Sequence, residues 1–156
     1  AFLSDKAGVV GPITLRHVGY GLALIGEVAV FAMVFRSRSP RALAYGLAAS
    51  ALVAFALLTS MHERYAYAAL AFLPLAFPDV RALVATIAFG AVFTLNLLAA
   101  APPTTAIADV VRFGGSVGIL GSIAMLAILS VTVTLLRSES LRLRQGPNAA
   151  ATEVPT

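Results

Sequence analysis

Five apolar segments separated by short polar stretches dominate the chain. They comprise residues 18–35, 42–60, 65–77, 82–101 and 114–136. A helix needs roughly 20 predominantly apolar residues to cross the hydrocarbon core of a bilayer, and four of the segments are close to that length. The pattern therefore predicts an all-α fold, a polytopic transmembrane helical bundle with about five spanning helices.

The third segment is the shortest, and its length depends on the residues that precede it. Its apolar run starts at Tyr65 and contains Pro74, with Pro78 just behind it. Ser60 and Glu63 fit the S-x-x-E capping box, in which two side chains satisfy the exposed N–H groups at a helix start. We therefore expect the third helix to begin after Ser60 and to span residues 61–77.

Composition points to lipid as the main solvent. Hydrophobic residues make up 60% of the chain and charged residues only 12%, against about 25% charged in a typical soluble domain. The net charge of +4 raises the question of nucleic acid, but the basic residues form no stripe interleaved with aromatic residues. We expect membrane lipid as a partner and no nucleic acid.

The distribution of basic residues between alternate loops predicts the orientation, because cytoplasmic loops retain positive charge during insertion. Seven basic residues fall on one side: Arg36, Arg38, Arg41, Arg81, Arg137, Arg142 and Arg144. Four fall on the other: Lys6, Arg16, Arg64 and Arg112. We therefore expect a multi-pass protein of the bacterial plasma membrane, with residues 1–17 extracytoplasmic and residues 137–156 forming a disordered cytoplasmic tail.

Four reactive or ionisable side chains follow one another at residues 62–65, where the chain is predicted to turn at the outer membrane surface. His62, Glu63, Arg64 and Tyr65 supply an imidazole, a carboxylate, a guanidinium and a phenol. Ionisable groups at membrane depth usually mark functional sites. The structural alternative is a capped helix with Arg64 at the headgroups and Tyr65 in the aromatic belt. We predict these four residues as the substrate- or lipid-phosphate-binding site. Successive helical residues step about 100° apart, so the four side chains cannot all meet one atom, and Arg64 and His62 are the better ligand candidates because Glu63 can instead serve the cap.

Met61-His62-Glu63-Arg64-Tyr65, after a helix ending Leu58-Thr59, resembles the carboxy-terminal region of bacterial GT-C-type membrane glycosyltransferases. These are relatives of the dolichyl-phosphate-mannose mannosyltransferases. The resemblance implies transfer of mannose or another hexose from a polyprenyl-phosphate donor to an extracytoplasmic acceptor. It also implies that Arg64 and His62 hold the lipid phosphate. The catalytic acid of that family lies near the amino terminus, so we expect this chain, which begins at Ala1, to be the carboxy-terminal piece of a longer enzyme.

A second candidate site lies in the first segment. Arg16, Tyr20 and Glu27 share one helical stripe, and Glu27 falls near the middle of the membrane, where a charge is costly. A carboxyl group hydrogen-bonded to a neighbouring helix is the structural alternative. Two other functions stay open: a secondary transporter with Glu27 in a proton relay, and a non-catalytic membrane scaffold subunit.

The sequence indicates no cofactor. The chain has no Cys, and its two His residues, His17 and His62, are far apart in the sequence. No metal site is therefore predicted from spacing, although a divalent metal in the complete enzyme stays open.

Overall fold

The computed structural model describes residues 8–10, 13–37, 39–58, 67–111 and 116–145, and this part of the chain is almost entirely helical. The elements are β1 (Gly8–Val10), β2 (Ile13–Thr14), α1 (Leu15–Ser37), α2 (Pro40–Leu57), α3 (Tyr67–Phe72), the 3-10 helix η2 (Leu73–Ala76), α4 (Val80–Ala100), α5 (Thr105–Val110) and α6 (Ser116–Gln145). β1 and β2 pair as a short antiparallel hairpin ahead of α1. The predicted all-α architecture is confirmed, with this hairpin as a small addition.

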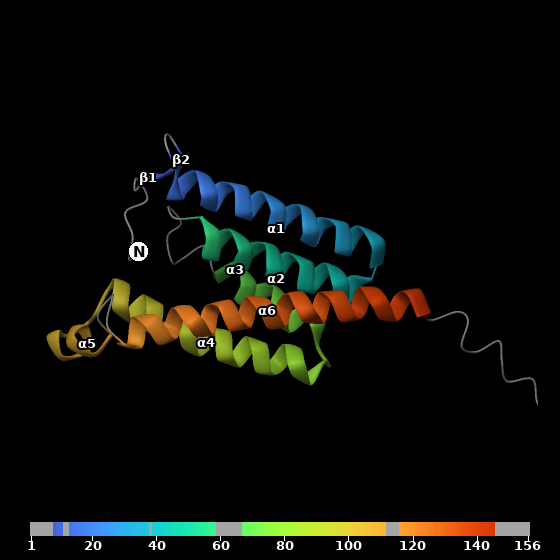
Figure 1. Ribbon diagram of the computed structural model, residues 1–156. Coiled ribbons are helices and arrows are strands. Elements are labelled where there is room, and N and C mark those ends of the chain that lie inside the picture. Colours follow the sequence, from blue (N-terminus) through green and yellow to red (C-terminus); the bar gives the residue numbers. More distant parts are fainter. Residues whose placement is uncertain (1–7, 11–12, 38, 59–66, 112–115, 146–156) are drawn as a thin grey trace, which may run out of the picture.

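Four helices are long and apolar enough to cross a membrane. They are α1, α2, α4 and the Ser116–Arg142 part of α6, with lengths from 18 to 27 residues. These lengths suit the roughly 20 residues that the hydrocarbon core requires. The helices lie side by side, with α1 and α6 running in one direction and α2 and α4 in the other (Figure 1). They indicate a multi-pass membrane protein.

The third predicted helix, residues 61–77, is not among these four. Its described part consists of six α-helical residues followed by the four-residue η2, which together rise only about 15 to 17 Å. Pro74 explains why the α-helix does not continue past Phe72: it has no N–H to donate to the carbonyl of Leu70, and its ring crowds that carbonyl. The described residues therefore show four long apolar helices and one shorter segment that breaks at Pro74, and the fifth spanning helix stays a prediction, because residues 61–66 lie outside the described part of the chain.

The short segment is nevertheless central to the bundle. Ala69, Leu73 and Ala76 are fully buried, and the segment packs against α2 on one side and α4 on the other. Since α2 and α4 run in the same direction, the chain between them must return from one end of the bundle to the other (Figure 1). α3 and η2 provide part of that return path.

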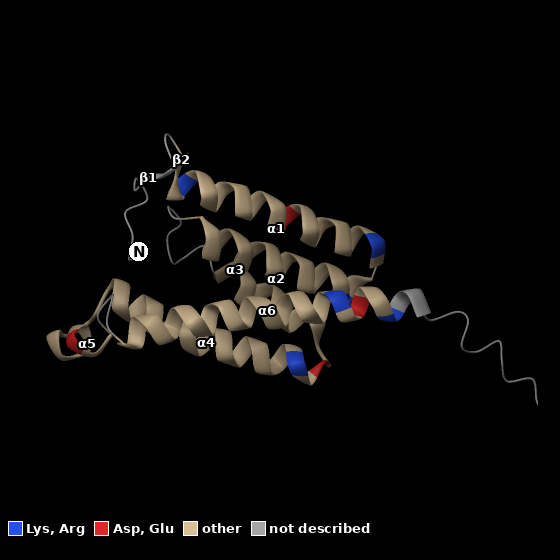
Figure 2. Cartoon of the chain, in the orientation of Figure 1, with Lys and Arg blue, Asp and Glu red and all other residues tan. Residues whose placement is uncertain are grey.

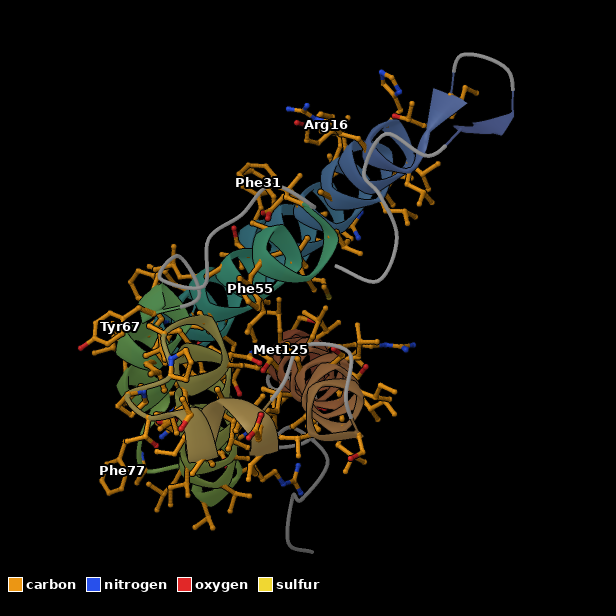
Figure 3. The ribbon with its side chains drawn as sticks, turned by 90° about the vertical axis from the view of Figure 1, so that its left-hand side faces the viewer. Arg16, Phe31, Phe55, Tyr67, Phe77 and Met125 are labelled. Carbon is orange, nitrogen blue, oxygen red and sulfur yellow. The ribbon has the colours of Figure 1, made fainter. Side chains whose placement is uncertain are left out.

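The outer surface of the bundle is apolar, as lipid contact requires. In α1 the buried side chains, Ala23, Val30 and Ser37, recur every seven residues and form one narrow stripe. Large side chains elsewhere on α1 are open, for example Phe31 at 69% exposure. Figure 3 shows Phe31, Tyr67 and Phe77 pointing outward, while Phe55 and Met125 point into the bundle. A surface of this kind is stable only against hydrocarbon or another apolar partner.

Several hydroxyl groups within the helices are satisfied by the helix backbone without water. Seven Ser and Thr side chains donate to the backbone carbonyl four residues earlier: Thr86, Thr94, Ser122, Ser130, Thr132, Thr134 and Ser138. Among the described residues, no buried side-chain nitrogen or oxygen lacks a hydrogen-bond partner. This pattern suits a membrane interior, where an unsatisfied polar group costs on the order of several kcal/mol.

The helix ends differ from the predicted boundaries. Ser39 and Asp79 cap α2 and α4 by accepting backbone N–H groups, so both helices begin two residues before the apolar runs at 42 and 82. α6 continues to Gln145. Residues 137–145 are therefore helical and not part of a disordered tail, while residues 146–156 lie outside the described part of the chain.

The described charged residues lie near the two ends of the bundle, apart from one acidic residue in the middle of α1 (Figure 2). The end where α1 stops and α2 and α4 start carries most of the described arginines. We call it the arginine end, and its described members are Arg36, Arg41, Arg81, Arg137 and Arg142. We call the other end, where α1 and α6 start and α2 and α4 stop, the amino-terminal end.

Candidate functional site

The predicted phosphate-binding residues His62, Glu63, Arg64 and Tyr65 lie outside the described residues. The described residues on either side of them belong to the amino-terminal end of the bundle, as Figure 1 shows for the last turn of α2 and the first turn of α3. α2 closes there with the N–H of Leu58 donating to the carbonyl of Ala54 at 3.0 Å. The roles assigned to the four residues stay predictions.

The start of α3, directly after these residues, is tied to α4 by aromatic contacts. The ring centroids of Tyr67 and Phe93 are 6.0 Å apart, and those of Phe93 and Phe89 are 5.9 Å apart. Phe89 is fully buried and Phe93 nearly so, whereas Tyr67 is 64% exposed. Offset aromatic pairs at this spacing stabilise the packing of the elements that carry them. The Tyr67 ring therefore connects the described start of α3 to α4.

The second predicted site is brought together only in part. Arg16 donates from Nε to the hydroxyl of Tyr20 at 2.8 Å, and its guanidinium carbon lies 5.5 Å from the centroid of the same ring. Glu27 is seven residues further along α1 than Tyr20, about 10 Å of helix rise away. The three residues share one stripe of α1, but Glu27 is too far along the helix to act on the same atom as Arg16.

His17, which sequence reasoning did not single out beyond its lack of a metal partner, closes the start of α1. Its Nδ1 accepts the backbone N–H of Thr14 at 3.2 Å and lies 2.9 Å from the Thr14 hydroxyl. This bond is one half of a capping box, with an imidazole in the position that Glu or Gln usually takes. The described His residue therefore has a structural role.

The arginine end holds a polar cluster that sequence reasoning missed. Tyr45, only 2% exposed, donates its hydroxyl to Oδ2 of Asp79 at 2.9 Å. Ser39 donates to Oε1 of Glu139 at 3.1 Å. The available sequence signals were Ser39-Pro40 and Pro78-Asp79, which are typical helix starts. These signals indicate the caps but not the partners of their side chains.

Asp79 is held in its charged form. Its pKa lies below the usual range, first because Oδ1 accepts the backbone N–H of Arg81. The Tyr45 hydroxyl and the charges of Arg81 and Arg41 act in the same direction and outweigh partial burial, which raises the pKa. One carboxylate thus joins the start of α4 to α2.

Metal coordination finds no support in the described residues, which contain no group of three or more His, Asp or Glu side chains placed to share an ion. Comparison of the chain with protein-family models, with curated proteins and with solved structures gives no match. The proposal for its function accordingly depends on its own residues and their placement.

Proposed function

We propose that this chain is the membrane region of a glycosyltransferase that moves a sugar from a polyprenyl-phosphate donor to an extracytoplasmic acceptor. The observation that carries the proposal is the Met61–Tyr65 motif and its resemblance to the GT-C-type enzymes. The multi-pass helical architecture is compatible with such an enzyme. The complete protein would supply the catalytic acid from a region upstream of this chain.

The distribution of charge supports the placement that the reaction needs. Among the described residues, arginine concentrates at the end of the bundle opposite to the last turn of α2 and the first turn of α3 (Figure 2). Under the positive-inside rule the arginine end is cytoplasmic. The described end of α2 at Leu57 and the start of α3 at Tyr67 would then lie on the extracytoplasmic side, where a lipid-linked sugar donor of this class is used.

Arg64 and His62 would act on the donor electrostatically. A guanidinium pairs with two phosphate oxygens through parallel N–H donors, and such contacts strengthen near the low-dielectric membrane. Neither residue is proposed to transfer a proton. The sugar and the acceptor would be selected by groups outside this pair.

A transporter finds less support. Transporters concentrate binding groups at the bilayer midplane, typically where helices are interrupted. In the four long helices as described, Glu27 is the charged residue near mid-helix, and the others occur close to helix ends. The interrupted segment of α3 and η2 carries no charged residue in its described part, Tyr67–Ala76.

The proposal is tested by replacing Arg64 in the full-length protein and measuring sugar transfer from a polyprenyl-phosphate donor, normalised to folded enzyme. Arg64→Lys keeps the charge but loses the paired donors, so its transfer rate should fall about tenfold to hundredfold if a charged hydrogen bond of roughly 1.5 to 3 kcal/mol acts in the transition state. Arg64→Ala should lose at least as much. Arg36→Lys, at the opposite end of the bundle, is the matched control and should stay active.

The same two Arg64 variants distinguish phosphate binding from a purely structural role of Arg64. If Arg64 only anchors a helix at the headgroups, Lys replaces it with little effect, because both side chains reach the interface. Full activity of both Arg64 variants would exclude the proposed phosphate contact. Absence of any transfer by the unmodified full-length protein, with its donor class varied, would exclude the glycosyltransferase.

A further inference from the structure

An apolar groove runs between α4 and α6 toward the arginine end. Its volume is about 580 Å³, within the roughly 300 to 1,000 Å³ of typical ligand sites. α4 and α6 pack directly against each other, and the groove follows their seam. Its lining from α4 is Val80, Arg81, Val84, Ala85 and Ala88. Its lining from α6 is Ala127, Ile128, Ser130, Val131, Thr134 and Leu135.

The walls of the groove offer hydrocarbon contacts and almost no hydrogen-bonding groups. The hydroxyl of Ser130 donates to the carbonyl of Leu126 at 2.8 Å, and that of Thr134 donates to the carbonyl of Ser130 at 2.7 Å. Val80 and Val84 are 69% and 60% exposed along the rim. The groove is therefore open to the membrane and suited to a flexible apolar chain.

Arg81 is the one charged residue in this lining. It is the second residue of α4, so it lies at the arginine end, where an arginine side chain reaches the headgroup region. The carboxylate of Asp79 accepts the backbone N–H of Arg81, and Arg81 is an exposed residue. The groove thus combines a hydrocarbon wall with a positive charge at one end.

We propose that the groove binds an anionic phospholipid from the leaflet at the arginine end, with one acyl chain along α4 and α6 and its phosphate at Arg81. A single lipid molecule supplies both features that the groove displays, an apolar chain and an anionic group at headgroup level. Basic sites between transmembrane helices select anionic lipids by this mechanism. The inference does not depend on the proposed glycosyltransferase function.

Charge must provide the selectivity. The acyl chain gains little by moving from lipid to the groove, because both surroundings are hydrocarbon. A zwitterionic lipid would fit the same walls, but its own cation offsets the attraction of its phosphate to Arg81. A basic residue near the membrane surface favours an anionic lipid by about fivefold in local concentration.

Quenching of a single introduced tryptophan by brominated lipids measures this preference, because the chain has no Trp. Ile87→Trp places the groove reporter on the exposed face of α4, one turn beyond Val84. Phe31→Trp is the matched control reporter on α1, at a similar distance from the arginine end and pointing away from the bundle (Figure 3). Each protein is reconstituted with brominated phosphatidylglycerol or brominated phosphatidylcholine at equal mole fractions.

We expect phosphatidylglycerol to occupy the site beside the groove reporter about fivefold more than phosphatidylcholine, with no comparable preference at the control reporter. Arg81→Gln should abolish the preference, whereas Arg36→Gln, which removes an exposed arginine from the same end, should retain it. Ala127→Phe should also abolish it by filling the groove while leaving Arg81 in place. Far-UV circular dichroism and gel filtration in detergent identify folded variants.

The remaining outcomes contradict the proposal. Equal quenching of the groove reporter by the two lipids, or an equal preference at both reporters, would show that the groove does not select an anionic lipid. A preference that survives Arg81→Gln would remove Arg81 from the site. One that survives Ala127→Phe in a folded protein would locate the lipid outside the groove.

Discussion

The contact between Tyr45 and Asp79 joins α2 to the start of α4, and it allows a quantitative test of the packing. The Tyr45 hydroxyl, on a residue that is 2% exposed, donates to Oδ2 of Asp79 at 2.9 Å. Oδ1 accepts the N–H of Arg81 at the same distance. The carboxylate is therefore both a helix cap and an inter-helix acceptor, and the two roles respond differently to substitution.

Tyr45→Phe retains the ring and removes only the hydroxyl. Asp79 is partly exposed, so water can replace the lost donor, and the free energy of unfolding should fall by about 1 kcal/mol. Asp79→Ala should cost more. It removes the cap of α4, roughly 0.5 to 2 kcal/mol, and leaves the buried Tyr45 hydroxyl without its acceptor, roughly 1 to 3 kcal/mol.

Unfolding by sodium dodecyl sulfate in mixed micelles, followed by circular dichroism, measures these costs. In the double variant the buried hydroxyl is absent, so the combined loss should be smaller than the sum of the single losses by about 1 kcal/mol or more. Tyr67→Phe is the control, because that residue is 64% exposed, and its loss should stay within about 0.5 kcal/mol. Additive losses for Tyr45→Phe and Asp79→Ala would refute the reasoning.

The pH dependence gives a second measure of the same contact. The pKa of Asp79 is lowered in the folded protein from its ordinary value of 3.8. Its stabilising contribution is therefore complete above that value and is lost as the pH falls through the folded pKa. The cost of Tyr45→Phe should shrink over the same acidic interval, and a cost that is constant with pH would contradict a bond to the carboxylate.

Three further predictions concern helix packing and orientation. Gly46→Ala should destabilise the bundle by about 1 to 2 kcal/mol, because the added methyl group meets a side chain of α1, whereas Gly21→Ala, which faces open space, should stabilise it by about 0.5 to 1 kcal/mol in a thermal melt. Glu27→Gln should preserve folded yield far better than Glu27→Lys; equal yields would mean that this residue faces water or headgroups. An impermeant thiol reagent should label His62→Cys only from the extracytoplasmic side and Ser140→Cys only from the cytoplasmic side, and the reverse pattern would overturn the orientation.

The long helices could be predicted from the sequence because, in a membrane, they are decided locally. Each needs enough apolar residues to cross the hydrocarbon and must satisfy its own backbone hydrogen bonds. The apolar runs 18–35, 42–60 and 82–101 accordingly match α1, α2 and α4 within a few residues. Local signals also account for the caps, since Ser39-Pro40 and Pro78-Asp79 have the residue types that begin helices.

The third predicted helix shows where prediction from local sequence fails. The apolar run and the capping box predicted one helix across residues 61–77, whereas the missing N–H of Pro74 changes α3 into η2 after Phe72. Pro74 is visible in the sequence as a helix-breaking residue. Only the tertiary structure shows that the segment around it is buried against α2 and α4. Contacts with both helices surround the described part of this segment, Tyr67–Ala76.

Only the tertiary structure decided which distant polar groups meet. Tyr45 and Asp79 are 34 residues apart, and Ser39 and Glu139 are 100 residues apart, so no local periodicity relates them. The groove that ends at Arg81 likewise needs one wall from α4 and another from α6. Hydrophobicity determines that a segment enters the membrane, but it does not distinguish one apolar neighbour from another. That choice depends on the shapes of the helix surfaces and on the few polar side chains that must find partners at their ends.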